Sequence, residues 1–276
     1  MRFFGCVVLL VLTAIATVAC GVEPKPRELP AGFANPRFML ISDQAQGPLL
    51  IGGDYGMQIS LDGGRTWQPT DNGTKPAVAA ASYGNNILIS RGTTAQIYGS
   101  VLTTPADPAA AWPFSGAVTE LAGNARRDRI WAIASDGGNR LMYSNDGGNY
   151  WWTMSAIGLC RHPRALAVGA PKGKLVERLW VACGQDGLFA SDDLGVNFVR
   201  VPGISNALTV AAARSQAGQI AVTTPQVVVT KDSGLTWYLS GLTASAVAID
   251  PRNPDLVFAA GSGGRLYASL DGGKSF

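Results

Sequence analysis

Ser60-Leu-Asp-Gly-Gly-Arg-Thr-Trp67 is the most informative stretch of this chain, because four variants of it follow. All five copies fit the pattern Ser/Thr-x-Asp-x-Gly-x-x-aromatic, and they contribute Asp62, Asp146, Asp193, Asp232 and Asp271. The copies begin at Ser60, Ser144, Ser191, Thr230 and Ser269, so successive starts are 84, 47, 39 and 39 residues apart. A period near 40 residues predicts one supersecondary unit that is repeated in space.

The residues around each phrase predict a unit of four short strands. A strand of small residues, such as Leu208 to Ala213, precedes a second apolar strand, such as Ile220 to Thr223. A short turn then leads to a third strand, which runs into the phrase, and the aromatic residue begins a fourth strand, as at Trp237 to Ser240. Short, evenly spaced strands with Gly/Asp turns favour an all-β fold. Six such units predict a β-propeller of six four-stranded blades, with the phrase as the hairpin between third and fourth strands.

Two places depart from this regular plan. The second unit lacks the phrase: after Tyr98-Gly99 we expect an expanded turn over Ser100 to Ala111, with Trp112 resuming the fourth strand. The last phrase ends at Phe276, where the fourth strand of the last unit should begin. A segment near the N-terminus, Pro26 to Phe33, is the one unassigned stretch that could close the ring. A truncated chain or a seventh blade is the alternative.

The repeated phrase has the chemistry of a tight turn. The Gly at its fifth position can take a positive φ, and its Asp and Ser/Thr can accept hydrogen bonds from turn N–H groups. A calcium loop needs several oxygens that converge on one ion, whereas each copy offers one or two. We therefore interpret the five Asp residues as structural, and we predict no metal site, no catalytic residue and no cofactor.

The first twenty residues differ from the rest. Arg2 precedes an almost wholly apolar stretch, Phe3 to Ala19, which predicts an export signal over residues 1–20. Small residues followed by Cys20 are typical of a bacterial lipoprotein signal, so Cys20 is the predicted lipidation site. Cleavage after Ala19 without lipid, or an uncleaved anchor, are the alternatives. Residues 21–36 are then a tether or a ring-closing strand, and residues 37–276 are the propeller. The predicted location is the cell membrane or outer membrane, on the extracytoplasmic side.

Composition excludes some functions. The net charge is +3 and no run of Lys or Arg stands out, so nucleic acid is not an expected partner. The chain has one histidine, His162, which leaves little room for His-based metal sites or catalytic triads. After Cys6 and Cys20 are assigned to the signal, Cys160 and Cys183 remain, and in an oxidising compartment they are a predicted disulfide. Two buried free thiols are the alternative.

These phrases resemble the Asp-box, or BNR, repeats of sialidase-like and sortilin-like propellers. The resemblance is strongest in Val247-Ala-Ile-Asp-Pro-Arg-Asn-Pro-Asp-Leu-Val-Phe-Ala-Ala-Gly261 and the final Arg265-Leu-Tyr-Ala-Ser-Leu-Asp-Gly-Gly-Lys-Ser-Phe276. An exported propeller of Asp-box blades is also similar to the photosystem II assembly and stability-factor family. The resemblance implies the fold, and for function it implies a hydrolase, a receptor or an assembly factor.

A sialidase would carry further signatures. The family implies an Arg-Ile-Pro phrase, three arginines that bind a carboxylate, a Tyr–Glu pair and an acidic Asp. The nearest phrase here, Asn35-Pro-Arg37, lacks Ile-Pro, and Glu120 and Glu177 are the only Glu residues of the blades. Glycoside hydrolysis needs two carboxyls at a fixed separation, and the sequence does not place such a pair. A sialidase-like glycoside hydrolase is therefore the alternative function.

We expect the binding surface on the face opposite the Asp-box turns, where second-to-third-strand turns and inter-blade loops meet. That face would carry Asp54, Tyr55, Arg91, Asp136, Arg140, Arg161, His162, Asp186, Gln226 and Arg265. Mixed charge with an occasional aromatic suits contact with a protein or peptide, and carbohydrate is compatible with it. The sequence thus predicts a membrane-anchored, non-catalytic binding or assembly scaffold. A photosystem II assembly factor is a further alternative.

Overall fold

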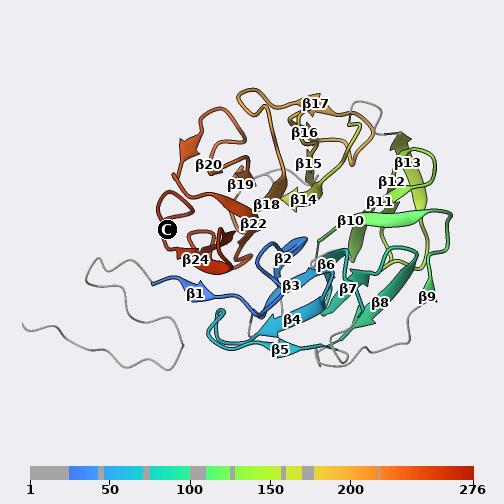
Figure 1. Cartoon of the computed structure of the whole chain (residues 1–276). Helices are drawn as coiled ribbons and strands as arrows, with labels where there is room; N and C mark the ends of the chain where they lie inside the picture. Colours follow the sequence, from blue (N-terminus) through green and yellow to red (C-terminus); the bar gives the residue numbers. More distant parts are fainter. Residues whose placement is uncertain are drawn as a thin grey trace, which may run out of the picture.

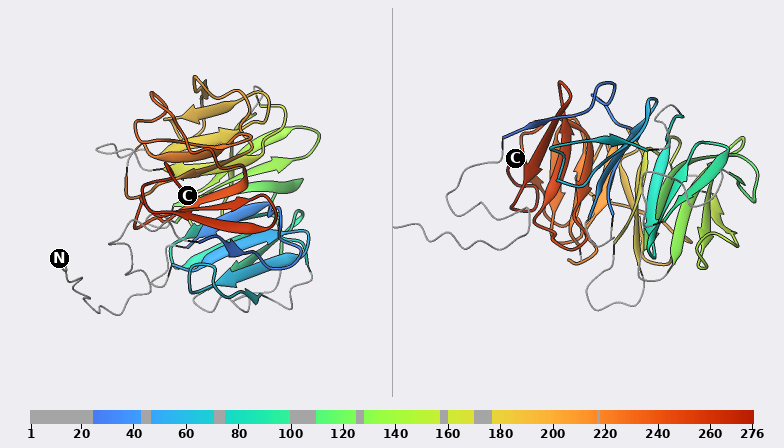
Figure 2. Two further views of the ribbon diagram at one scale, coloured as in Figure 1. Left: turned by 60° about the vertical axis from the view of Figure 1, so that its left-hand side comes forward. Right: turned by 90° about the horizontal axis from the view of Figure 1, so that it is seen from below.

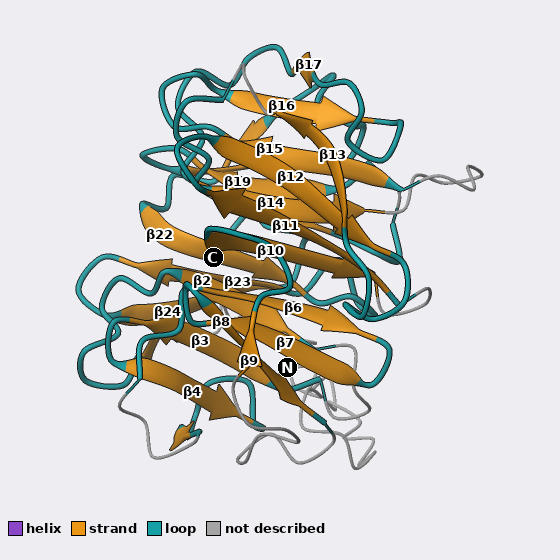
Figure 3. Ribbon diagram, turned by 90° about the vertical axis from the view of Figure 1, so that its right-hand side faces the viewer, coloured by secondary structure: helices purple, strands orange, loops and turns teal. Residues whose placement is uncertain are grey.

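The computed structural model describes residues 25–42, 47–70, 75–99, 110–124, 128–156, 160–169, 177–216 and 218–276. The predicted export signal and Cys20 lie outside these ranges. The described residues form strands and loops and contain no helix (Figure 3). Accordingly, none of these ranges holds a helix with the length and apolar character to cross a bilayer.

Within the described residues, twenty-four strands form six four-stranded antiparallel sheets arranged as blades around a ring (Figure 1). Blade 1 contains β2 (Phe38–Ile41), β3 (Leu49–Gly53), β4 (Gly56–Ser60) and β5 (Gln68–Pro69). Blade 2 contains β6 (Ala79–Tyr83), β7 (Asn86–Ser90), β8 (Thr94–Tyr98) and β9 (Ala110–Ala111). Blade 3 contains β10 (Ala117–Asn124), β11 (Arg129–Ser135), β12 (Asn139–Ser144) and β13 (Trp152–Ala156). These blades confirm the predicted all-β propeller plan.

The second half of the chain repeats the same order. Blade 4 contains β14 (Ala165–Gly169), β15 (Arg178–Ala182), β16 (Leu188–Ser191) and β17 (Val199–Arg200). Blade 5 contains β18 (Thr209–Ala212), β19 (Ile220–Thr223), β20 (Val227–Thr230) and β21 (Tyr238–Leu239). Blade 6 contains β22 (Ala244–Ile249), β23 (Val257–Gly261), β24 (Arg265–Ser269) and a strand from the other end of the chain, β1 (Arg27–Glu28).

The strand β1 closes the ring. Arg27 pairs with Leu266 and Glu28 with Arg265, antiparallel to β24. In Figure 2 the blue strand β1 lies beside the red strand β24 near the C-terminus. Leu29 and Phe33, which follow β1, are buried between blades 6 and 1. The ring therefore closes with six blades, and the alternative of a seventh blade is wrong.

The hydrophobic core is divided among the blade interfaces. Six clusters of buried side chains occur, and each joins two neighbouring blades. Between blades 3 and 4, for example, Trp131 and Leu141 pack with Leu179 and Val181, and all four side chains are fully buried. Because each blade buries both of its faces only against its neighbours, the blades stabilise one another around the ring.

The innermost strands are built from small residues, which lets the blades converge at the centre. At Gly123, at the end of β10, a Cβ atom would lie 2.3 Å from the carbonyl oxygen of Ser82 in β6. Backbone of blade 2 thus occupies the space that a side chain would need there. The small-residue strands of the sequence are therefore the strands that surround the axis.

One expectation for blade 2 is wrong. We expected Trp112 to begin the fourth strand, but β9 ends at Ala111, with Thr94 opposite Ala111 and Ala95 opposite Ala110. The Trp112 indole lies beyond the strand, is buried, and donates a hydrogen bond to the carbonyl of Gly92. The aromatic residue therefore ties the outer strand to a turn of its own blade. The rest of the predicted expanded turn, residues 100–109, lies outside the described residues.

Because consecutive strands of each blade are antiparallel, the two faces of the ring carry different sets of turns. The first-to-second-strand turns and the Asp-box turns lie at one end of the blades, which we call the Asp-box face. The second-to-third-strand turns and the connections between blades lie at the other end, which we call the loop face. The face predicted for binding is the loop face.

Candidate functional site

The Asp boxes form closed hydrogen-bond networks within their own turns. In each copy the Ser or Thr hydroxyl donates to the Asp carboxylate and accepts from the N–H of the fifth-position Gly. The Asp also accepts the backbone N–H four residues later, at 2.9–3.0 Å. The five Gly residues have φ between 90° and 95°. These contacts leave the Asp residues in a structural role, with their acceptor capacity used inside the turn.

The same hydrogen bonds stabilise the charged form of each Asp. They lower the pKa of Asp62, Asp232 and Asp271 to about 2, and they lower the pKa of Asp146 and Asp193 as well. Partial burial opposes this lowering at Asp62 and Asp271.

We expect the propeller to lose stability in acid. An Asp with an unfolded pKa near 3.9 and a lower folded pKa stabilises the fold above about pH 4, and this contribution is lost as the pH falls through the folded pKa. Urea unfolding midpoints at pH 6, 4, 3 and 2 should therefore decline mainly between pH 4 and 2. A midpoint that stays constant down to pH 2 would contradict the Asp-box interpretation.

A channel runs along the axis of the ring between the six innermost strands. Its wall is mostly apolar and small, with Ala79, Ala81, Ala165, Ala211 and Ala246 among the lining residues. Three ionisable side chains of described residues also line it: Arg37, Glu120 and Arg214. The carboxyl of Glu120 is thus the one acidic group on the described part of the channel wall.

A β-bulge sets the direction of Glu120. The pairing of β10 with β11 shifts between Val118 and Glu120, so Glu120 instead of Thr119 lies opposite Ile133. Ile133 belongs to the core between blades 3 and 4, and opposed residues of antiparallel strands share a face. Glu120 therefore lies on the side of blade 3 that faces blade 4.

The surroundings of Glu120 favour its neutral form. Burial in the channel wall raises the pKa of Glu120 well above its ordinary value, while the positive charges of Arg37 and Arg164 act to lower it. Arg37 immediately precedes β2 and Arg164 immediately precedes β14, so both guanidiniums start from the loop face. The channel therefore has a basic mouth on the loop face with a single carboxyl inside it.

The opposite end of the channel is crossed by Arg214. This residue follows β18 in blade 5, and its guanidinium donates to the carbonyl oxygen of Gly123 at the end of β10 in blade 3. Burial lowers the pKa of Arg214 to about 10, so the side chain stays charged at neutral pH. A fixed cation thus lies across the Asp-box end, and the loop face is where a ligand can approach.

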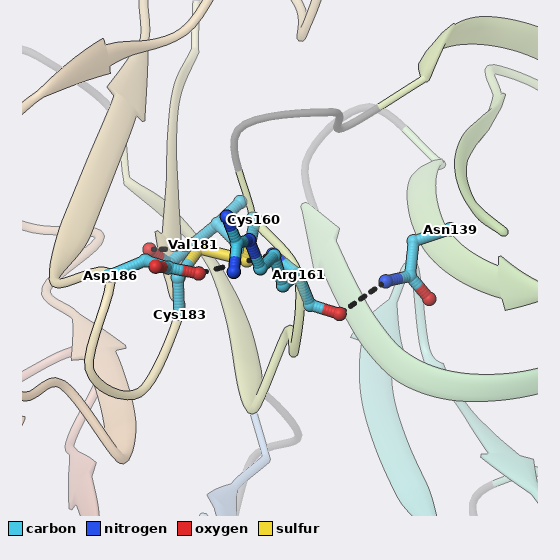
Figure 4. The surroundings of a disulfide bond; sticks show 6 residues. All are labelled: Asn139, Cys160, Arg161, Val181, Cys183 and Asp186. Carbon is cyan, nitrogen blue, oxygen red and sulfur yellow. Dashed lines mark hydrogen bonds between the residues drawn. A yellow bond between two sulfur atoms is a disulfide. The ribbon is translucent and has the colours of Figure 1, made fainter.

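A disulfide fixes the loop beside the channel mouth. Cys160 and Cys183 are bonded and buried, and their Cα atoms are 5.3 Å apart (Figure 4). The Arg161 N–H donates to the Asp186 carboxylate at 3.2 Å, and the Arg161 carbonyl accepts from the Asn139 side chain of blade 3 at 3.2 Å. The loop from Cys160 to Arg164 is therefore held at three points, which presents the Arg161 and His162 side chains to solvent.

The remaining predicted residues of the loop face have different roles. The Arg91 guanidinium binds Gln96, Tyr98 and the carbonyls of Lys75 and Pro76, so it holds two segments of blade 2 together. Arg140 donates to Ser115 and lies near Asp136, whereas Arg37 pairs with Asp54 at 2.9 Å. Among the predicted residues that the structure describes, Tyr55, Arg161, His162 and Arg265 are exposed and their side chains have no such pairing.

Glu177, the other Glu residue of the blades, is buried. It accepts a hydrogen bond from Asn124 and pairs with Arg129, both in blade 3. It therefore joins blades 3 and 4 and is absent from the channel. Among the described residues no group of three or more His, Cys, Asp and Glu side chains is arranged to hold a metal ion.

Sequence reasoning missed the channel mouth. Arg37 was considered only as part of a failed sialidase phrase, and Arg164 and Arg214 were not singled out. The available signal was the isolated Glu120 in a strand of otherwise small or apolar residues, Val118 to Ala122. A charged side chain in a strand next to the axis can contact water only in the channel.

The comparisons with known proteins agree with this architecture. A family model described as BNR/Asp-box repeat matches residues 58–69, the first copy of the phrase. The chain is a six-bladed propeller with Asp-box repeats. A search of curated proteins gave no match.

Solved structures share the fold at low sequence identity. The GH74 xyloglucanase from Xanthomonas campestris is 16% identical with a TM-score of 0.62, covering 91% of this chain and 46% of that one. The GH74 enzyme of Niastella koreensis is 15% identical with a TM-score of 0.55, covering 84% and 36%. YCF48 bound to D1 peptide is 14% identical with a TM-score of 0.51, covering 91% and 97%. The chain thus spans less than half of either GH74 enzyme, and at these identities the likeness shows the fold alone.

Proposed function

We propose that this propeller is an exported, lipid-anchored and non-catalytic module that binds a protein or peptide on its loop face. The observation that carries the proposal is the channel mouth. There, exposed guanidiniums on the loop fixed by the disulfide lie around the single carboxyl of the channel wall, that of Glu120. The partner we propose presents carboxylates to Arg161 and Arg164. The lipid anchor is the predicted one at Cys20.

The charge of the loop face supports such a partner. Arg37 and Arg140 are each matched by an Asp, but within the described residues Arg161 and Arg164 form no ion pair. Both are exposed, so their charge is available to a ligand that approaches the mouth. Complementary charge at an interface speeds association and orients the partner. A rigid loop also lowers the entropic cost of binding, because its side chains are already ordered.

The fold is compatible with peptide binding. One solved propeller of this fold, YCF48, was determined with a D1 peptide bound. At 14% identity its ligand cannot be transferred to this chain, so the identity of the partner is left to experiment. A role as a photosystem II assembly factor remains a narrower form of the same proposal.

One observation favours a glycoside hydrolase as the second candidate. The raised pKa of Glu120 is what a general acid requires, and three of the structural neighbours are GH74 enzymes. The mechanism also needs a second carboxyl across the substrate. Of the described residues that line the channel, only Glu120 has a carboxyl, which supports the binding function over the hydrolase.

The test is reversal of the charges at the mouth. We expect Arg161→Glu with Arg164→Glu to reduce capture of the partner from native membranes at least about tenfold, since each charge-assisted contact is worth roughly 1.5–3 kcal/mol. Arg200→Glu is the matched control, because Arg200 is an exposed arginine on the outer strand β17. Equal losses in both variants would indicate a nonspecific charge effect and contradict the proposed site.

The hydrolase is tested on the same protein. Xyloglucan and a fluorogenic sialoside are incubated with the wild-type chain and with Glu120→Gln. Turnover that disappears in Glu120→Gln would establish the hydrolase and overturn the proposed function. Absence of turnover by the wild type, together with loss of capture in the charge-reversed variant, would support the binding module.

A further inference from the structure

Most of the large apolar side chains that are exposed in the described residues belong to blades 3, 4 and 5. Tyr150 and Val199 are each 72% exposed, Leu235 is 84% exposed and Leu239 is 65% exposed. Single exposed apolar residues are ordinary on protein surfaces, but a cluster that recurs on adjacent blades needs an explanation.

These side chains occupy neighbouring places in the three blades. One group lies one or two residues before the aromatic residue of the Asp-box phrase, and the other lies one or two residues after it, in the outer strand. We call the set the apolar rim: Tyr150, Trp152, Val196, Val199, Leu235 and Leu239. Because the outer strands β13, β17 and β21 begin at the Asp-box turns, the whole rim lies at the outer border of the Asp-box face.

The other three blades provide an internal comparison. Their outer strands are Gln68–Pro69, Ala110–Ala111 and Arg27–Glu28, which are polar or small. The first residue of the outer strand is therefore a large apolar one in blades 3 to 5 and not in the other three, where Leu61 in the first Asp-box turn is the exposed large apolar side chain of the described Asp-box residues. The requirements of the fold are equal in both halves, so folding does not account for the difference.

The composition of the rim suits a lipid bilayer. Trp and Tyr side chains favour the boundary between headgroups and acyl chains, and aliphatic side chains gain free energy below it. A cation lies beside this surface as well: the Lys274 ammonium is 4.6 Å from the centre of the ring of Tyr238, which precedes Leu239. A lysine beside interfacial aromatics can reach lipid phosphates.

The path of the chain points to the same surface. Because β1 runs antiparallel to β24, the chain enters it from the direction of the Asp-box face, and Arg27 and Glu28 then pair with Leu266 and Arg265 at the loop-face end of β24. The Arg27 guanidinium donates to the carbonyl of Gly63 in the first Asp box. Blade 6 adjoins blade 5, which carries the rim. Cys20 precedes Arg27 by seven residues, which span at most about 25 Å when extended. A lipid on Cys20 would thus hold the Asp-box face close to the bilayer.

We infer that the apolar rim of blades 3 to 5 rests on the lipid bilayer, so that the Asp-box face lies toward the membrane and the loop face toward the partner. The inference rests on the proposed lipid anchor, which supplies the local concentration that a small apolar surface needs. The inference adds a fixed orientation of the propeller on the membrane, since a flexible tether alone would leave the ring free to turn.

The test uses the full-length lipidated chain in vesicles of phosphatidylethanolamine and phosphatidylglycerol in which part of the lipid is brominated. Bromine quenches tryptophans that enter the interface. We expect quenching in the wild type, and we expect Trp152→Phe to remove most of the quenched emission. A rim variant, Val199→Ser with Leu235→Ser and Leu239→Ser, should reduce the quenching of Trp152. Tyr55→Ser is the matched control, because Tyr55 is 65% exposed on the loop face, and it should leave quenching unchanged.

A second measurement separates the rim from the anchor. The Cys20→Ser chain lacks the acylation site, and we expect it to bind the same vesicles weakly, with the rim substitutions reducing this residual partition about tenfold. Mass spectrometry of the wild type shows whether Cys20 is acylated, which tests the anchor independently. If Trp152 were not quenched in an acylated, vesicle-bound chain, the proposal that the apolar rim contacts the bilayer would be wrong. A rim variant that converts a dimer into a monomer would also contradict it, because the rim would then be an interface between two copies.

Discussion

Removal of the ring-closing strand should cause the largest loss of stability. We expect a chain that begins at Pro36 to unfold at a much lower urea concentration than one that begins at Lys25, or to remain unfolded. The shorter chain lacks β1, which supplies the fourth strand of blade 6, and it lacks Leu29 and Phe33. Each buried apolar side chain costs about 2–5 kcal/mol when it is lost, and whole domains are stable by only about 5–15 kcal/mol.

The chain that begins at Lys25 is the matched control, because both proteins lack the predicted export signal and differ only in the closing segment. Leu29→Ala with Phe33→Ala gives a milder form of the same perturbation and should shift the midpoint part of the way. Equal unfolding midpoints for the two chains would show that blade 6 is stable with three strands, and ring closure by β1 would lose its energetic importance.

Loss of the disulfide should be the second large effect. We expect Cys160→Ser with Cys183→Ser to lower the free energy of unfolding by about 3 kcal/mol, because the bond closes a loop with a sequence separation of 23 residues. Both sulfur positions are buried between blades 3 and 4, so two hydroxyls there would add a desolvation cost. Urea unfolding of the wild type with and without reductant gives the measurement.

The same substitutions should weaken binding at the loop face. Without the disulfide, the loop that carries Arg161, His162 and Arg164 keeps only its hydrogen bonds to Asp186, Asn139 and Ala182. Partner capture should therefore fall, although no proposed contact residue is changed. Reduced stability with full capture would indicate that the disulfide serves the fold alone and that the loop needs no bracing.

The fold followed from the sequence to a large extent because its information is local and repeated. Six small-residue strands, five turn phrases and a period near 40 residues specify a ring of blades without any long-range knowledge. The second unit was harder to place. Its outer strand consists of two alanines, and Trp112 imitates the aromatic of the missing phrase while it binds a different turn.

The candidate site was less predictable, because it depends on direction as well as position. The sequence put Arg91 and Arg161 on the same face, but only the structure shows that the first guanidinium is held by its own blade and the second is exposed. Glu120 lies in the channel wall because of a one-residue bulge, and a bulge has no clear signature in a strand of this composition. The disulfide was easier to predict, because Cys160 and Cys183 are the two cysteines that remain after the first twenty residues.

The contact between Arg214 and Gly123 has a mechanical consequence. It joins blades 5 and 3, which are not neighbours in the ring, so these two blades are linked directly as well as through blade 4. Blades 3 and 5 therefore cannot move apart at the Asp-box end of the channel without breaking that contact. A ligand that enters the channel from the loop face would therefore meet, at the far end, a width that this contact holds constant.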